Sequence, residues 1–294
     1  MLAVVGTVPD DAFPIVDGIV SVNKDSLLIG NHEIDINRGT AALLASAFMA
    51  CRFFGKPGPT AFLVGDTGRG FGSRKLYEYL VEKLPERHYT SLAFHYIQPD
   101  VDWHNKVLFA IDEMEARPVL IADAGFMYAA KMSGQANAYD VFTPDIGELA
   151  FLADESAPHP FYTRGFILHE NQQAGQLIER AYAHHNAARY LLVKGEKDIV
   201  ANKSGILDTI TGPVIPAMEA IGGTGDIITG LLAGIISAGY NIQPACSMAS
   251  RISRMAGKSA DPHPATQVAE IIQKIPDCME LLIKQQPAGC TCDY

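Results

Sequence analysis

The sequence is poor in cysteine and tryptophan, and the cysteine shortage excludes one class of protein. Its 294 residues include 5 cysteines and 1 tryptophan. An odd number of scattered cysteines makes no disulfide framework in a chain of this size. Only Cys290 and Cys292 have a suggestive spacing, and two thiols without a second pair of ligands make an incomplete zinc site.

Positive charge and long apolar runs are also scarce. Lys and Arg number 23 against 33 Asp and Glu, which gives a formal net charge of −10. This charge argues against sequence-independent binding to nucleic acid or binding to an anionic membrane. The N-terminal "MLAVVGTVPDD" lacks the basic flank of a secretory signal, and no apolar stretch is long enough to span a bilayer. We therefore expect a cytoplasmic protein, with room for a small anionic ligand at a local site.

What the chain does contain is a repeated alternation of short apolar runs and longer amphipathic ones. Helical spacing appears between the apolar runs, for example over 74–84 and 170–186. The runs that predict strands cover 60–66, 91–98, 118–124, 139–144 and 189–195. Strands that alternate with helices predict an α/β sandwich, with a mostly parallel sheet covered on both faces.

Two regions depart from this alternation. The first 38 residues alternate at period two around turn residues, which predicts a small antiparallel ribbon at a sheet edge or reaching toward a neighbouring subunit. From about residue 222 the pattern is helical, over 224–238, 244–257 and 265–285. With no low-complexity linker, we expect one domain over 1–294, with the ribbon at 1–38, the core at 60–258 and a helix and tail at 259–294.

The residues that follow each predicted strand are the first place to look for a site, because ligands gather at the carboxyl ends of parallel strands. These loops are "GDTGRGFGS" from 65, "QPD" from 98, "DAGF" from 123, "TPDIGE" from 143 and "KGEKD" from 194. Glycine beside a carboxylate or lysine suits a phosphate site with a metal, although the same residues are common turn formers. The first loop lacks the G-x-x-x-x-G-K-[ST] spacing and is therefore a poor P-loop.

The strongest single element is "GGTGDIITGLLAG", which begins at Gly222. Its glycines leave the backbone bare where an apolar helix begins, so the first turn offers N–H groups to an anion. Asp226 in that turn has two interpretations. It either pairs with the helix dipole, with Thr224 as a possible cap, or it accepts a proton from an attacking hydroxyl during phosphoryl transfer.

This segment resembles the G-[TS]-G-D signature of the ribokinase-like superfamily. The form with Ile-Ile-x-Gly after the Asp is most similar to the ATP/ADP-dependent NAD(P)H-hydrate dehydratases, a family related to carbohydrate kinases. In matching order, "DVFTPDIGELAFL", "LLVKG" and "VLIADAGFM" are similar to that family's T-P-H-x-G-E, L-K-G and D-A-D-A-L segments. The resemblance covers roughly 60–258 and implies a three-layer ribokinase-like α/β/α fold.

The resemblance also implies a role for each matching residue. Asp226 would be the catalytic base, and the backbone of Gly222, Gly223, Thr224 and Gly225 the anion hole. Glu148 would organise Mg²⁺, and Lys194 with Gly195 would border an ATP or ADP donor. The residues on the acceptor side would be Gly65, Asp66, Arg69, Gly72, Asp123, Thr143 and Asp145. In these dehydratases a hydroxyl of hydrated NAD(P)H is phosphorylated and phosphate then leaves. Relatives are often oligomers, so a homo-oligomer is expected here.

The chain departs from the family pattern at several positions. Asp145 stands where the dehydratases have His and many ribokinase-like kinases have Asn, and the first loop carries Arg69 and Phe71 instead of the family's Tyr. Residues 1–58 match nothing in the pattern. Two alternatives therefore stay open: a small-molecule kinase of the same fold, and a nucleotide-binding relative without turnover. A dinucleotide acceptor needs cations for its pyrophosphate, which the basic residues of 69–75 could supply.

Overall fold

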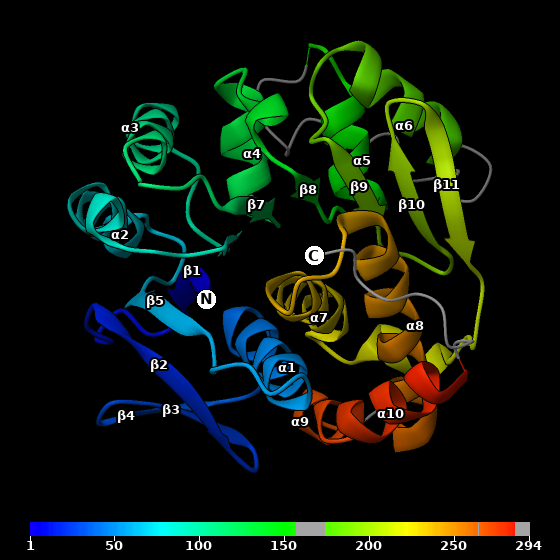
Figure 1. The fold of residues 1–294 in the computed structure, drawn as a ribbon. Coiled ribbons are helices and arrows are strands. Elements are labelled where there is room, and N and C mark those ends of the chain that lie inside the picture. Colours follow the sequence, from blue (N-terminus) through cyan, green and yellow to red (C-terminus); the bar gives the residue numbers. More distant parts are fainter. Residues whose placement is uncertain (157–173, 264, 286–294) are drawn as a thin grey trace. The chain divides into compact units, whose positions relative to one another are not determined.

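The computed structural model describes residues 1–156, 174–263 and 265–285 (Figure 1). The chain forms two compact units. The first contains Met1–Val4, Val16–Phe62 and the described residues from Ile210 onward, and the second contains Val5–Ile15 and Leu63–Thr209. The expectation of a single domain stays a prediction. The Cys290 and Cys292 pair lies outside the described residues.

The second unit is built on parallel strands. Its strand order is β11-β10-β9-β8-β7-β6, followed by β1 and β5, of which residues 5–8 and 63–65 belong to this unit. Strands β6, β7, β8 and β9 pair in parallel, and β10 runs antiparallel to β9. The bounds are β1 (Leu2–Val8), β5 (Thr60–Gly65), β6 (Ser91–His95), β7 (Val119–Ala122), β8 (Val141–Phe142), β9 (Tyr190–Val193), β10 (Asp198–Asn202) and β11 (Gly205–Ile210). Every residue of β5 and β6 is buried, as expected of strands covered on both faces.

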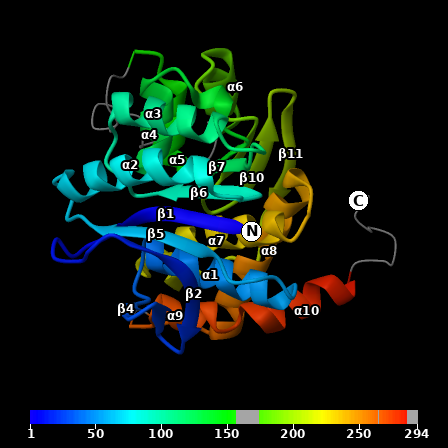
Figure 2. The ribbon, with the colours of Figure 1, turned by 60° about the vertical axis from the view of Figure 1, so that its left-hand side comes forward.

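Helices connect these strands. They are α2 (Phe71–Lys83), α3 (Val101–Asp112), α4 (Gly125–Met132), α5 (Ile146–Ala153) and α6 (Ala174–Ala183). In both views, α2, α3, α4 and α5 lie on the same side of β6 and β7 (Figures 1 and 2). Short 3₁₀ turns follow at Leu84–Glu86 and Ala136–Ala138. The sequence prediction of an α/β fold with a mostly parallel sheet is confirmed.

The first unit combines an antiparallel ribbon with a group of helices. Strands β2 (Val16–Asn23), β3 (Ser26–Ile29) and β4 (His32–Asp35) pair antiparallel and end the order β1-β5-β2-β3-β4. The helices are α1 (Thr40–Phe53), α7 (Thr224–Ser237), α8 (Ile242–Ala260), α9 (Val268–Ile272) and α10 (Ile275–Gln285), with a 3₁₀ turn at Pro216–Ala220. The predicted ribbon is thus confirmed for Val16–Asp35.

Three details differ from the sequence prediction. Strand β1 is not part of the ribbon, because its seven residues are nearly all buried and pair within the sheet order. Helix α1 was missed. The helical pattern predicted over 265–285 is divided into α9 and α10, because Pro276 has no N–H to donate to the preceding turn.

Close contact between α1 and α7 depends on glycine. A Cβ added at Gly230 would lie 2.1 Å from the carbonyl oxygen of Leu43 and 2.1 Å from the hydroxyl of Ser46. Only a residue without a side chain lets the two backbones approach this closely. Among the described residues, no helix combines the length and the apolar character that crossing a bilayer requires.

Candidate functional site

The loop before α7 owes its glycines to local geometry. Gly223 is the residue before the first helical turn and has a φ of 96°, a conformation that favours glycine. A Cβ at Gly223 would also lie 3.0 Å from the Cα of Arg38. No side chain caps α7, since Thr224 is its first residue and donates its hydroxyl to the carbonyl of Ile221 at 3.3 Å. Thr224 is therefore not the cap that one reading of the sequence allowed.

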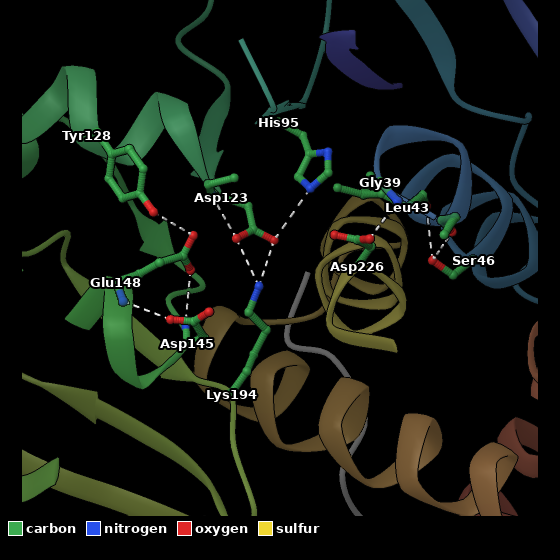
Figure 3. Close-up of polar contacts among 12 residues, drawn as sticks. Gly39, Leu43, Ser46, His95, Asp123, Tyr128, Asp145, Glu148, Lys194 and Asp226 are labelled. Carbon is green, nitrogen blue, oxygen red and sulfur yellow. Dashed lines mark hydrogen bonds and ion pairs between the residues drawn. The ribbon is translucent and has the colours of Figure 1, made fainter. Parts of the chain in front are cut away.

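Asp226 lies in the first turn of α7 and is nearly buried. Its Oδ2 accepts a hydrogen bond of 2.7 Å from the backbone N–H of Gly39 (Figure 3). Gly39 has a φ of 67° and precedes the first residue of α1. The carboxylate therefore interacts with the positive ends of two helices, its own and α1. Sequence reasoning found Asp226 and missed Gly39, although a glycine directly before the apolar run of α1 was a usable signal.

In the second unit, charged residues collect at the carboxyl ends of four neighbouring parallel strands. His95 ends β6, Asp123 follows β7, Asp145 follows β8 and Lys194 follows β9. Lys194 Nζ donates to both oxygens of Asp123 at 2.9 Å, and His95 Nε2 lies 4.0 Å from Asp123 Oδ2 (Figure 3). Because His95 and Asp123 are each 1% exposed, this is a buried ion pair with a buried imidazole beside it.

Glu148 and Asp145 are bound to each other at the start of α5. Asp145 Oδ1 accepts from the N–H of Glu148 at 2.7 Å, and Glu148 Oε2 accepts from the N–H of Asp145 at 2.8 Å. Tyr128 donates its hydroxyl to Glu148 Oε1 at 3.1 Å. This is a capping box, so both acids have a local structural role as well as any chemical one.

The electrostatics around Glu148 show an excess of negative charge. The pKa of Glu148 is raised to about 8, mainly by burial, with the nearby carboxylates of Asp123 and Asp145 adding to the rise and Lys194 opposing it. Three carboxylates share one ammonium here. Carboxylate oxygens are the ligands that Mg²⁺ prefers, so the residues present fit a divalent cation that would relieve this repulsion.

The predicted nucleotide and acceptor residues beside this cluster have backbone roles. Thr143 is fully buried, and its N–H donates to the carbonyl of Ala122 at 3.2 Å. The N–H of Gly195 donates to Asp198 Oδ1 at 3.1 Å, which shapes the turn after β9. The structure thus brings Asp123, Asp145, Glu148 and Lys194 together. Sequence reasoning missed His95 and Tyr128, which carry no motif.

In the first glycine loop, 65–73, the backbone N–H groups bind a carboxylate of the chain itself, that of Asp66. Asp66 Oδ1 accepts from the N–H groups of Gly68, Arg69 and Gly70 at 2.9, 2.9 and 3.0 Å. Its Oδ2 accepts from the N–H and the hydroxyl of Ser73, each at 2.8 Å. Although burial opposes the change, the hydrogen bonds from Ser73, Gly70 and Gly68 lower the pKa of Asp66. The carboxylate therefore occupies the cradle at the start of α2.

The glycines of this loop serve the packing of the backbone. A Cβ at Gly65 would lie 1.8 Å from the carbonyl oxygen of Asp10, and one at Gly72 would lie 1.9 Å from that of Gly65. The close approach of backbone segments within the chain thus explains both glycines without a bound molecule. Arg69 is exposed and lies 3.9 Å from Asp11 Oδ2.

Comparison with known proteins places this geometry in a family. The model of the NAD(P)H-hydrate dehydratase family matches residues 99–277, which include Glu148, Lys194 and Asp226 but not the first glycine loop. An uncharacterized protein of Methanocaldococcus jannaschii is 38% identical over 243 residues, covering 82% of this chain and all of that protein.

Two further relatives have named activities. The ADP-dependent (S)-NAD(P)H-hydrate dehydratase of Cenarchaeum symbiosum is 27% identical over 52% of this chain and 48% of its own length. The bifunctional NAD(P)H-hydrate repair enzyme of Pyrobaculum aerophilum is 25% identical over 55% of this chain and 30% of its own length. The chain thus spans about half of the first enzyme and less than a third of the second.

Solved structures agree on the fold. A ribokinase-like protein of Enterococcus faecalis has a TM-score of 0.59 at 16% identity, covering 95% of this chain and 86% of that one. The ADP/ATP-dependent NAD(P)H-hydrate dehydratase of Bacillus subtilis, co-crystallised with ATP/Mg²⁺, has a TM-score of 0.52 at 18% identity, covering 96% and 88%. The fold is ribokinase-like, and the chain belongs to the NAD(P)H-hydrate dehydratase family.

Proposed function

We propose that the chain is an ATP- or ADP-dependent enzyme that dehydrates hydrated NAD(P)H, with Asp226 as the base. The observation that carries this proposal is the carboxylate of Asp226, which stands in the first turn of the buried helix α7 after an uncapped run of glycines. The named activities of the C. symbiosum and P. aerophilum relatives support the substrate class.

The chemistry follows from the groups at the start of α7. The substrate hydroxyl attacks the terminal phosphorus of the donor, and Asp226 accepts the hydroxyl proton as the new O–P bond forms and the donor's bridging O–P bond breaks. The N–H groups over Gly222, Gly223, Thr224 and Gly225 stabilise the charge on the transferred group. In the second step the C–O bond breaks, phosphate leaves with the electron pair, and the neighbouring carbon loses a proton to water, which restores the dihydropyridine.

Glu148 would hold Mg²⁺ in this proposal, directly or through water, with Asp145 beside it. A bound Mg²⁺ supplies positive charge that neutralises the donor phosphates. The chain's own contribution is orientation: the capping box and Tyr128 hold the Glu148 carboxylate in a fixed direction. Lys194 and Gly195 would border the donor nucleotide, and Asp123, Thr143 and Asp145 would face the acceptor.

A second candidate is a small-molecule kinase of the same fold. Asp145 favours this candidate, because an acid stands where the dehydratases have His. Its Oδ1 accepts a hydrogen bond from the first turn of α5. Such an enzyme would perform only the first step, and the phosphorylated product would be released.

The test compares the unaltered protein with Asp226→Asn. We measure ATP- or ADP-dependent loss of hydrated NADH through the returning absorbance of the dihydropyridine. Asn keeps an acceptor for the N–H of Gly39, so the fold should persist while activity falls by about 10²-fold or more, the lower range for a lost general base. Asp277→Asn is the matched control, since Asp277 also lies in a first helical turn of the first unit and is exposed.

The outcomes separate the candidates. Activity in the unaltered protein and in Asp277→Asn, with loss in Asp226→Asn, supports the dehydratase. No activity on hydrated NADH, together with ATP turnover on a sugar or vitamin-precursor alcohol, contradicts it and supports the kinase. Nucleotide binding without turnover on any of these substrates leaves a non-catalytic binding protein.

A further inference from the structure

A cavity of about 550 Å³ lies beside the start of α2, within the second unit. Its wall is partly apolar, with Phe13 and Phe71 among the lining residues, and partly cationic, with Arg69 and Lys75. A second cavity of about 280 Å³ shares Arg69 and Phe71 with the first and adds Arg74. Volumes of roughly 300–1,000 Å³ are typical of small-molecule sites.

The cations around Phe71 are available to a ligand. Arg69, Arg74 and Lys75 lie within seven residues that contain no acid, in a chain whose net charge is −10. Arg69 and Arg74 have acidic neighbours, Asp11 at 3.9 Å and Asp100 at 3.5 Å, but the two arginine side chains are 72% and 65% exposed. Exposed pairs of this kind contribute little stability, so a phosphate can replace the carboxylate at small cost.

The backbone of the loop cannot hold that phosphate, because Asp66 already accepts from its N–H groups. Any anion bound here must therefore be held by side chains. This separates the site from an ordinary helix N-terminus.

Phe71 indicates the rest of the ligand. It is the first residue of α2, is 76% exposed and lines both cavities. An exposed ring among cations is the arrangement that stacks on a nucleobase while the cations meet its phosphates. An inorganic anion alone would make no use of the ring.

We propose that the cavity formed by Phe13, Arg69, Phe71 and Lys75 binds the adenosine-phosphate half of the dinucleotide substrate. The inference rests on the proposed function, since hydrated NAD(P)H has an adenine and a pyrophosphate remote from the reacting ring. Arg69, Phe71 and Lys75 lie outside the segment that the family model matches, so they would set the substrate preference of this particular chain.

The experiment uses two variants, Phe71→Ala and the double variant Arg69→Ala/Lys75→Ala. The matched control is Lys106→Ala/Phe109→Ala, which removes an exposed cation and a phenylalanine that is 68% exposed from α3 of the same unit. Binding of NADPH is measured by calorimetry with the donor site saturated by ADP. KM and kcat for hydrated NADPH are measured on the same proteins.

We expect each variant to weaken NADPH binding and to raise KM about tenfold, the effect of losing one stacking or phosphate contact, with kcat and melting temperature unchanged. The control should bind as the unaltered protein does. Unchanged NADPH affinity and KM in both variants would overturn the inference while leaving the proposed function intact.

The measurement of NADPH binding tests the inference even if the proposed function fails. Should the unaltered protein show no dehydratase activity, a loss of NADPH affinity confined to the two variants still supports a dinucleotide site. Absence of NADPH binding by the unaltered protein overturns the inference, as does equal weakening of the affinity for inorganic phosphate alone.

Discussion

His104 should make the protein lose stability in mild acid. The side chain is fully buried on α3, and burial lowers its pKa from 6.5 to about 4. Its Nδ1 lies 3.1 Å from the hydroxyl of Ser133, which also donates to the carbonyl of Ala130. Because that hydroxyl already donates, we assign the imidazole proton to Nδ1, which leaves Nε2 to accept from the hydroxyl of Tyr139 at 2.8 Å. A second proton on Nε2 would face a donor.

The magnitude follows from the difference in pKa between the two states. Because the pKa of His104 is lower in the folded state, the stabilisation is present above pH 6.5 and is lost as the pH falls toward 4. Between pH 7 and pH 5 the loss is about 2 kcal/mol, and it reaches about 3 kcal/mol at pH 4.

The assay is urea unfolding at several pH values for the unaltered protein and for His104→Gln, which keeps polar groups near both partners but does not titrate. Between pH 7 and pH 5, the fall in the free energy of unfolding should be about 2 kcal/mol smaller in the variant than in the unaltered protein. His88→Gln is the control, because that side chain is 72% exposed. Identical pH dependence in His104→Gln and the unaltered protein would refute the reasoning, as would an imidazole resonance that titrates near 6.5.

Three other substitutions test the packing and the two acids. Gly230→Ala should lower the free energy of unfolding by about 1–3 kcal/mol, because its Cβ would collide with α1. The control is Gly175→Ala, whose Cβ has space, and its melting temperature should be unchanged. Asp66→Asn should lower the free energy of unfolding at neutral pH by about 1–3 kcal/mol. The difference from the unaltered protein should shrink as acid protonates Asp66. The control Asp11→Asn should change the free energy of unfolding little. Glu148→Gln should be more stable than the unaltered protein at pH 9, because a raised pKa gives stability that is present below 4.5 and lost as the pH rises through about 8. An unfolding curve at pH 9 that shows no gain contradicts this.

The sequence predicted the parallel strands well, because burial on both faces leaves continuous apolar runs such as those of β5 and β6. It missed α1, whose alanine-rich run has no polar face because α7, α9, α10 and strand β2 all pack against it. It also missed β10 and β11, which are only partly buried. Among site residues, it found Asp226 and Glu148 from motifs. His95 carries no motif, and its place beside Asp123 depends on a contact between distant segments, which spacing cannot reveal.

The two glycine loops of this chain show why a glycine pattern alone does not locate a phosphate. Both precede a helix, and neither Gly70 before α2 nor Gly223 before α7 provides a side-chain cap. At α2, however, an acid stands at the beginning of the loop, and Asp66 reaches the N–H groups that a phosphate would need. At α7 the acid comes after the glycines, inside the helix, and its Oδ2 accepts from Gly39 of another segment. An acid placed before the glycines fills their cradle, whereas one placed after them leaves the uncapped N–H groups to an outside anion. The position of the acid therefore favours 222–225 over 65–73 as the place where the proposed donor phosphate would bind.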